Sequence, residues 1–289
     1  MIATVHSREV ELKTDEMIKP MQTALHKGDL KSISKFIEQG FPLNKLLFHG
    51  KNSTALHVAI DVGSRHKVIE LLLAAGADPD VKNDQFKETA LHQACEQGDL
   101  TAVKLLIDAD ANPNVETESG VTPVMLAAEA PKKGKEIVAA LLASGASVAP
   151  NKNGRNPLHS NIKDPTIVDQ LIKAGADVNG SLHGVTPLMK ALEKVLVWKS
   201  GSAIRSSYKP QPEVMAVLLA NGADPTAKFP RAMLCGEDAE NQSIIDYARK
   251  KKLPASVIEM LESGISSQPS KKSSKKSTPK RQAKAAKKK

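Results

Sequence analysis

Apolar residues fall along most of this chain in pairs of short helical patterns that are separated by polar turns. The stretch from Glu88 to Asn114 contains one such pair. A small-residue helix is predicted from Ala90 up to a break at Gly98, and a more apolar helix from Leu100 to Ile107. Neither helix can bury its apolar face alone. The pattern therefore predicts that neighbouring pairs stack and supply one another's core.

The opening of the first helix recurs six times. Each copy begins with Thr, Asn or Ser, whose side chain can cap a helix by accepting a hydrogen bond from an amide of the first turn. In three copies Pro follows, at a position where its missing amide hydrogen has no cost. The copies begin at Thr54, Thr89, Thr122, Asn156, Thr186 and Ser243, which lie 35, 33, 34, 30 and 57 residues apart. A period near 33 residues predicts a solenoid of stacked repeats.

The end of the second helix recurs as well. Gly adopts the left-handed conformation of a helix C-terminus without strain, and Asp is among the few other residues that tolerate it. The predicted helix ends are Gly40, Gly76, Asp110, Gly145, Gly175, Gly222 and Gly264.

These repeats resemble the ankyrin repeat. The segments STALHVAI, VIELLLAAGADPD and ETALHQACEQGDLTAVKLLIDADANPN are similar to that family's TPLH-x-A and LLL-x-x-GAD-x-N signatures, and the similarity covers about Met21 to Gly264. The resemblance implies an all-α solenoid of helix–turn–helix layers joined by β-hairpin fingers. It also implies that the fingers and first helices line a concave face, which in this family binds partner proteins.

We expect four parts along the chain. Residues 1–18 are an N-terminal extension, 19–50 a capping repeat without the TPLH opening, 51–264 the remaining repeats, and 265–289 a Lys/Ser-rich tail. An insertion at about 195–211 lies within the 57-residue spacing. The copy that begins at Asn156 has lost a few residues, and we expect Pro165 to begin a shortened second helix.

Charge separates the tail from the rest of the chain. The net charge is +9, yet residues 266–289 hold ten Lys and Arg and no acid, which leaves 31 basic and 32 acidic residues before them. The segment, called the basic tail below, has too few apolar residues to offset chain entropy and is predicted to be disordered. Its basic residues are Lys271, Lys272, Lys275, Lys276, Lys280, Arg281, Lys284, Lys287, Lys288 and Lys289.

No motif in the chain indicates catalysis, a cofactor or a metal. His57, His92 and His159 occupy one register position, and repetition argues for hydrogen bonds within or between repeats rather than a single active site. Gly50-Lys51 lacks the other residues of a phosphate-binding loop. Cys95 and Cys235 have no metal-ligand spacing, and Cys95 is predicted to be a small buried apolar residue. We therefore expect a protein that is not an enzyme.

Residues in the fingers are the best candidates for partner contacts. They are Phe86, Lys87, Glu116, Glu118, Asn153, Arg155 and His183. Phe86 either remains exposed as an anchor for a partner or folds back onto its finger. Trp198 and Tyr208 lie in the insertion, which forms either an elongated first helix whose Trp covers the next layer or a protrusion specific to a partner.

The expected function is that of an adaptor, monomeric and located in the cytoplasm or nucleus, since no signal peptide or membrane-spanning segment is apparent. The basic tail is interpreted as a nuclear address, an electrostatic contact or a solubilising segment. A nucleic-acid-associated protein, whose binding through the tail weakens steeply with salt, is one alternative. A bacterial effector secreted into a host, and a regulatory or inhibitory subunit of an enzyme, are others.

Overall fold

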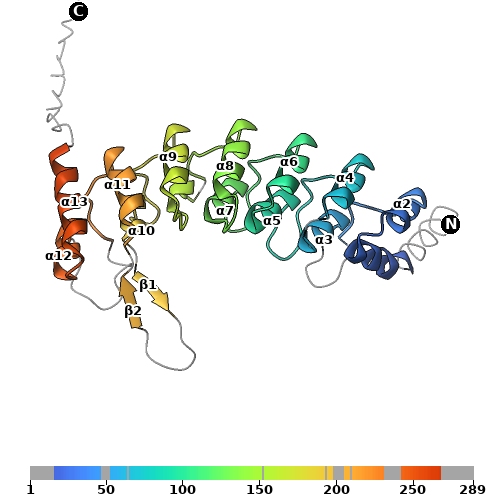
Figure 1. Ribbon diagram of the computed structural model, residues 1–289, viewed down its shortest axis with the longest axis horizontal. Helices are drawn as coiled ribbons and strands as arrows, with labels where there is room; N and C mark the ends of the chain where they lie inside the picture. The colour runs from blue at the N-terminus through green and yellow to red at the C-terminus, as the bar shows by residue number, and fades with distance from the viewer. Residues whose placement is uncertain are drawn as a thin grey trace, which may run out of the picture.

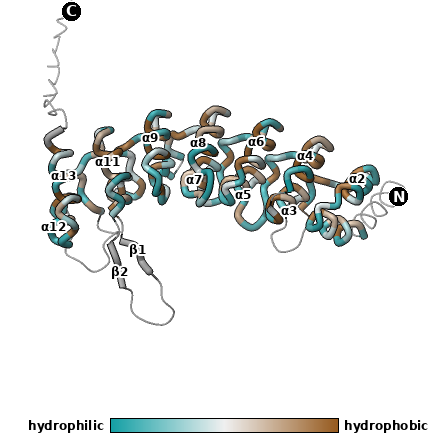
Figure 2. Tube along the Cα trace, viewed as in Figure 1, coloured by the Kyte–Doolittle hydropathy of each residue, from teal (hydrophilic) through white to brown (hydrophobic). Residues whose placement is uncertain are grey.

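The computed structural model describes residues 16–46, 53–63, 65–151, 153–192, 194–197, 205–208, 210–230 and 242–267. These residues form an elongated stack of helix pairs, in which α2 and α13 lie near opposite ends (Figure 1). Apolar and polar segments alternate within the pairs along the whole stack (Figure 2). The all-α solenoid predicted from the sequence is confirmed.

The helices form two rows. The first-helix row begins with residues 16–27 and continues through α3 (Ala55–Asp61), α5 (Ala90–Gln97), α7 (Pro123–Glu129), the 3-10 helix η1 (Pro157–His159), α10 (Pro187–Ala191) and α12 (Ile244–Lys250). The second-helix row contains α2 (Leu30–Glu38), α4 (His66–Ala74), α6 (Leu100–Asp108), α8 (Gly134–Ala143), α9 (Pro165–Lys173), α11 (Pro212–Ala220) and α13 (Ala255–Ser267).

One continuous core lies between and within the rows. Leu91 of α5, Leu106 of α6 and Leu141 of α8 are fully buried, as are small residues such as Ala94. Each fully buried Leu stabilises the stack by about 2 kcal/mol relative to an exposed one. Each pair packs on the pair before and after it, as in the series α3, α5 and α7. The core therefore depends on neighbouring layers, as the pattern predicts.

The predicted helix ends are confirmed at six positions and wrong at the seventh. Gly40, Gly76, Asp110, Gly145, Gly175 and Gly222 all have positive φ, between 61° and 98°. Gly264 instead lies inside α13, which continues to Ser267. A β-carbon on Gly264 would lie 2.7 Å from Leu219 Cδ2 of α11, so this Gly allows close packing between helices rather than a turn.

The copy that begins at Asn156 is shortened in its first helix, not in its second. Its first helix is only the three-residue η1, whereas α9 has nine residues, as α6 has. The expectation of a shortened helix from Pro165 is therefore wrong. Asp164 accepts a hydrogen bond from the Thr166 amide, which gives α9 a complete N-terminal cap directly after the deletion.

Three further details differ from the sequence-based expectations. Residues 16–18 are helical, so the first layer begins before residue 19. The insertion contains an antiparallel pair, β1 (Lys194–Val197) and β2 (Arg205–Tyr208), rather than an elongated helix. The described fingers contain isolated antiparallel bridges, Leu182 with Val185 and Lys228 with Ser243, or a closing hydrogen bond such as Asn83 N to Glu88 O at 2.7 Å, rather than longer paired strands.

Side-chain hydrogen bonds connect successive layers at the base of the fingers. Asn44 Oδ1 accepts from the Asp78 amide, Asp80 Oδ1 from Asn112, Asn114 Oδ1 from Ser147, and Asn179 Oδ1 from Asp224, at 2.7–2.9 Å. The corresponding residue after α8 is Ala149, which has no polar side chain. The series of bonds is therefore interrupted next to the layer that contains η1.

Candidate protein-binding site

A groove of about 380 Å³ lies between two successive fingers. One wall comes from the finger between α4 and α5, the other from the finger between α6 and α7, and the floor includes a residue of α7. We call it the finger groove; it is lined by Phe86, Glu88, Thr117, Glu118, Ser119, Val121 and Leu126. It lies on the fingers and the first-helix row, where the sequence leads us to expect a binding face.

Phe86 remains exposed at the edge of this groove. Half of its surface, 51%, is accessible to solvent, although it belongs to a class of residues that cores normally bury. Asn83 holds the turn in which it lies, because its Oδ1 accepts from the amides of Phe86 (3.1 Å) and Glu88 (3.3 Å). Of the two alternatives for Phe86, the exposed position is the one that the structure contains.

The second wall is held by its own hydrogen bonds. The Thr117 amide donates to Val121 O at 2.9 Å, and the Val121 amide donates to Thr117 Oγ1 at 3.0 Å. The Glu118 amide donates to Phe86 O at 3.4 Å, which joins this wall to the first. These bonds hold both walls of the groove in place within the chain itself.

Two buried histidines form hydrogen bonds with backbone carbonyl groups of the groove. His57 Nε2 lies 3.1 Å from Glu88 O, and His92 Nε2 lies 3.2 Å from Val121 O. In each case the amide of the N-cap residue donates to Nδ1, from Thr54 at 3.4 Å and from Thr89 at 3.2 Å. Since Nδ1 accepts, Nε2 carries the proton and donates to the finger carbonyl. The prediction of structural hydrogen bonds is confirmed.

His159 repeats this arrangement in the layer of η1. Its Nδ1 accepts from the Asn156 amide, and its Nε2 lies 3.1 Å from Gly180 O and 3.2 Å from Val185 O. Burial lowers the pKa of His92 to about 4, and burial also lowers the pKa of His159. Both imidazoles are neutral at pH 7, as the pattern of hydrogen bonds requires.

The groove is acidic. Its lining contains two carboxylates, those of Glu88 and Glu118, and no basic residue. The nearby Lys side chains point to other groups, because Lys87 Nζ pairs with Asp84 at 2.9 Å and Lys82 Nζ donates to Glu116 O at 2.7 Å. From residue 105 to residue 131 the chain has five carboxylates and no Lys or Arg. The groove therefore favours a ligand that is positively charged.

The predicted contact residues are only partly brought together. Phe86 and Glu118 line one groove, and Lys87 and Glu116 lie in its two fingers. Asn153 of the next finger lies beside Gly120, since its Nδ2 would be 3.1 Å from a β-carbon on that Gly. Arg155 is half-buried in the next finger, and His183 is exposed one finger further along. The sequence-based prediction missed Glu88, Val121 and Leu126, because they lie at positions that recur in every copy and do not stand out as candidates for binding.

Several candidates fall outside the described residues. They are Trp198, Cys235 and the basic tail after Ser267, including all ten of its Lys and Arg positions. Tyr208 belongs to β2. Phe229, in the long finger after α11, is buried, and its ring centroid lies 4.7 Å from that of Tyr247 in α12.

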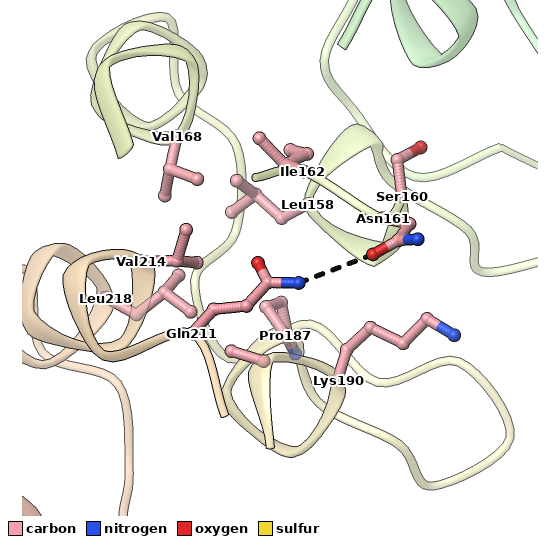
Figure 3. Close-up of a pocket in the computed structure, with 11 residues that line it drawn as sticks. Leu158, Ser160, Asn161, Ile162, Val168, Pro187, Lys190, Gln211, Val214 and Leu218 are labelled. Atoms are coloured by element: carbon pink, nitrogen blue, oxygen red, sulfur yellow. Dashed lines mark hydrogen bonds between the residues drawn. The ribbon is translucent and has the colours of Figure 1, made fainter. Parts of the chain in front are cut away.

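A second cavity lies beside the shortened layer. It lies among Leu158, Ile162, Val168, Pro187 and Val214, where η1 leaves the space of a missing helical turn, and Gln211 extends across it to Asn161, with Nε2 and Oδ1 3.4 Å apart (Figure 3). Its free volume of about 10 Å³ is close to that of a single water molecule. This cavity is a packing defect of the layer and is too small for a substrate.

The remaining reactive groups of the described chain are not arranged for chemistry. Cys95 is fully buried, as predicted, and burial raises the pKa of its thiol, which makes it inert. Within the described ranges no three His, Cys, Asp or Glu side chains gather as metal ligands would. No helix in these ranges is both long and apolar enough to cross a membrane.

Known proteins match this chain in sequence and in fold. The family model described as ankyrin repeats (3 copies) matches residues 62–152. The nuclear factor NF-kappa-B p105 subunit of Gallus gallus is 29% identical over 170 residues, which cover 58% of this chain and 16% of that protein. The B-cell lymphoma 3 protein of Homo sapiens is 25% identical over 241 residues, or 67% of this chain and 52% of that protein. The chain thus spans about half or less of these relatives.

Among solved structures, the human ASB11 ankyrin repeat domain superposes with a TM-score of 0.62. The match covers 85% of this chain and 97% of that domain at 21% sequence identity. At this identity the similarity is one of fold.

Proposed function

Since the chain is an ankyrin repeat protein, we propose that it is a non-enzymatic adaptor that binds a partner protein through the finger groove. The observation that carries this proposal is the half-exposed Phe86 ring, held at the edge of a preformed groove with acidic walls. Exposed aromatic residues are frequent sources of binding energy at interfaces. A preformed groove also loses little entropy when a partner binds.

The chemistry of the groove describes the partner. An apolar side chain of the partner would pack on Phe86, Val121 and Leu126, and a neighbouring Lys or Arg would lie near Glu88 and Glu118. We therefore expect a partner segment that combines an apolar residue with basic residues. When a partner occupies the groove, the basic tail would be available as a nuclear address or as a second, electrostatic contact with an acidic part of that partner, and two weak contacts on one chain increase avidity.

Quantitative affinity capture with the full-length protein tests this function. Phe86→Ala and Glu118→Arg remove the apolar and the acidic part of the groove, and we expect each to reduce recovery of a partner protein at least tenfold. Ile265→Ala and Glu70→Arg are matched controls, because these residues are exposed on α13 and α4. Once the partner is identified, its affinity for the native protein and for each variant is measured with purified components.

Replacement of the ten basic tail residues by Gln, combined with nuclease treatment, distinguishes an adaptor from a nucleic-acid-associated protein. If recovery depends only on the tail and disappears with nuclease, the adaptor proposal is wrong. The chain would then be a nucleic-acid-associated protein, and its affinity would fall steeply as salt increases.

A further inference from the structure

The finger groove and the basic tail have complementary charges within one chain. The lining of the groove contains the carboxylates of Glu88 and Glu118 and no Lys or Arg. The tail has ten Lys and Arg and no acid. Among the described residues the Glu118 carboxylate has no ion-pair partner, and its side chain is exposed.

The lining of the groove suits a Lys side chain in particular. A Lys stem can pack along the exposed Phe86 ring, because long charged side chains cover apolar surface while the ammonium group remains in water. An ammonium group near the ring face is also attracted by the ring quadrupole. Glu88 and Glu118 lie on the two walls beside this ring, where they would face that ammonium group.

The tail is long enough to reach the groove. The last described residue is Ser267, and the 22 residues from 268 to 289 span up to roughly 75 Å when extended. The groove lies three to four layers away from α13, and stacked helices are about 10 Å apart, which gives roughly 40 Å along the stack. The segment Lys280–Lys289 is therefore the part of the tail that can reach the groove.

We propose that the Lys280–Lys289 segment binds the finger groove of the same molecule and competes with the partner for it. The inference concerns the same groove as the proposed function. Its consequence, autoinhibition, rests on the proposed function, because the tail can inhibit only a groove that binds a partner. A tethered segment has an effective concentration in the millimolar range, so a weak contact is sufficient. A partner, or a modification that neutralises the tail, would release the groove.

Zero-length cross-linking of full-length protein at low concentration tests the contact directly. A carbodiimide joins a carboxylate to a Lys amine only when the two groups are in contact. We expect tail Lys residues to be joined to Glu118 and Glu88 within monomers, at least fivefold more than to Glu70 or Glu96, which are exposed on other surfaces. The yield should fall severalfold in 0.5 M salt, where screening shortens the range of the attraction.

Two variants make the result specific. Phe86→Ala should reduce cross-links from the tail to Glu118 about threefold, while the matched Ile265→Ala, which removes the other large exposed apolar side chain of the described residues, should not. Circular dichroism confirms that both variants fold.

The inference is overturned if tail Lys residues join all exposed carboxylates equally. It is also overturned if the cross-links to Glu118 appear only in dimers, which would make a second copy the occupant. No partner is present in this experiment, so its failure leaves the adaptor proposal to be decided by the capture experiment.

Discussion

At the scale of single residues, the buried histidines connect the helix caps to the finger groove. His92 accepts from the Thr89 amide and donates to Val121 O, so one neutral imidazole joins a helix cap to a wall of the groove. Sequence alone assigned these residues a structural role, because they recur at one register position. It could not show that the carbonyl groups they hold belong to the groove.

His92 also makes stability depend on pH. Its pKa is about 4 in the folded protein and about 6.5 in the unfolded chain, so the unfolded state takes up a proton first as pH falls. The contribution of neutral His92 to the free energy of unfolding is fully present above pH 6.5. It is lost between pH 6.5 and 4, and the loss amounts to roughly 3 kcal/mol. Urea unfolding at several pH values should show this slope in the native protein.

His92→Gln should reduce this slope, and His183→Gln, a change at an exposed imidazole, should leave it as it is. An equal slope in the native protein and in His92→Gln would show that His92 does not cause the pH dependence.

At the scale of elements, two glycines that end helices have different roles. Gly76 follows α4 with φ 86°, and a β-carbon there would lie in open space. Gly98 caps α5 with φ 70°, and a β-carbon there would collide with the carbonyl oxygen of Lys132 in the next layer. Only the stacked structure distinguishes a Gly that is needed for backbone conformation from one that is needed for close approach.

This difference gives a paired prediction. Gly76→Ala should lower the free energy of unfolding by about 1 kcal/mol, the cost of a left-handed conformation with a β-carbon. Gly98→Ala should lower it by roughly 3 kcal/mol, because the collision between layers is added. Chemical denaturation of both variants measures the difference, and equal losses would contradict a tight contact at Gly98.

At the scale of the whole molecule, the stack has a weak junction between its fourth and fifth layers. The first helix of the fifth layer is reduced to η1, and the series of side-chain hydrogen bonds between layers lacks a member at Ala149. The Asn161 amide donates to Glu129 Oε1 of α7 at 3.0 Å across this junction and supplies one connection. Because repeat proteins are stabilised by contacts between neighbours, we expect such a junction to divide the stack into two cooperative parts.

Ala149→Asn should strengthen this junction. By analogy with Asn114, which accepts from Ser147 N and donates to Gly145 O, the new side chain would accept from Asp177 N and donate to Gly175 O. We expect a gain of about 1 kcal/mol and a more cooperative unfolding transition. Asn114→Ala is the inverse control and should destabilise the protein by a similar amount. Unchanged hydrogen exchange in α9 of Ala149→Asn would refute the weak junction.

The sequence by itself determined the solenoid, the N-cap position of each first helix, the buried histidines and six of the seven helix ends, because these features depend on local preferences that recur with the period; the capping hydrogen bond expected from the Thr122 side chain is, however, absent from the structure. The tertiary structure decided where the period is interrupted: which helix of the copy that begins at Asn156 is short, that the insertion pairs as strands, and that Gly264 serves packing. It also brought Phe86 and Glu118 from different copies into one groove. Contacts between copies depend on how layers stack, and a one-dimensional pattern does not contain this information.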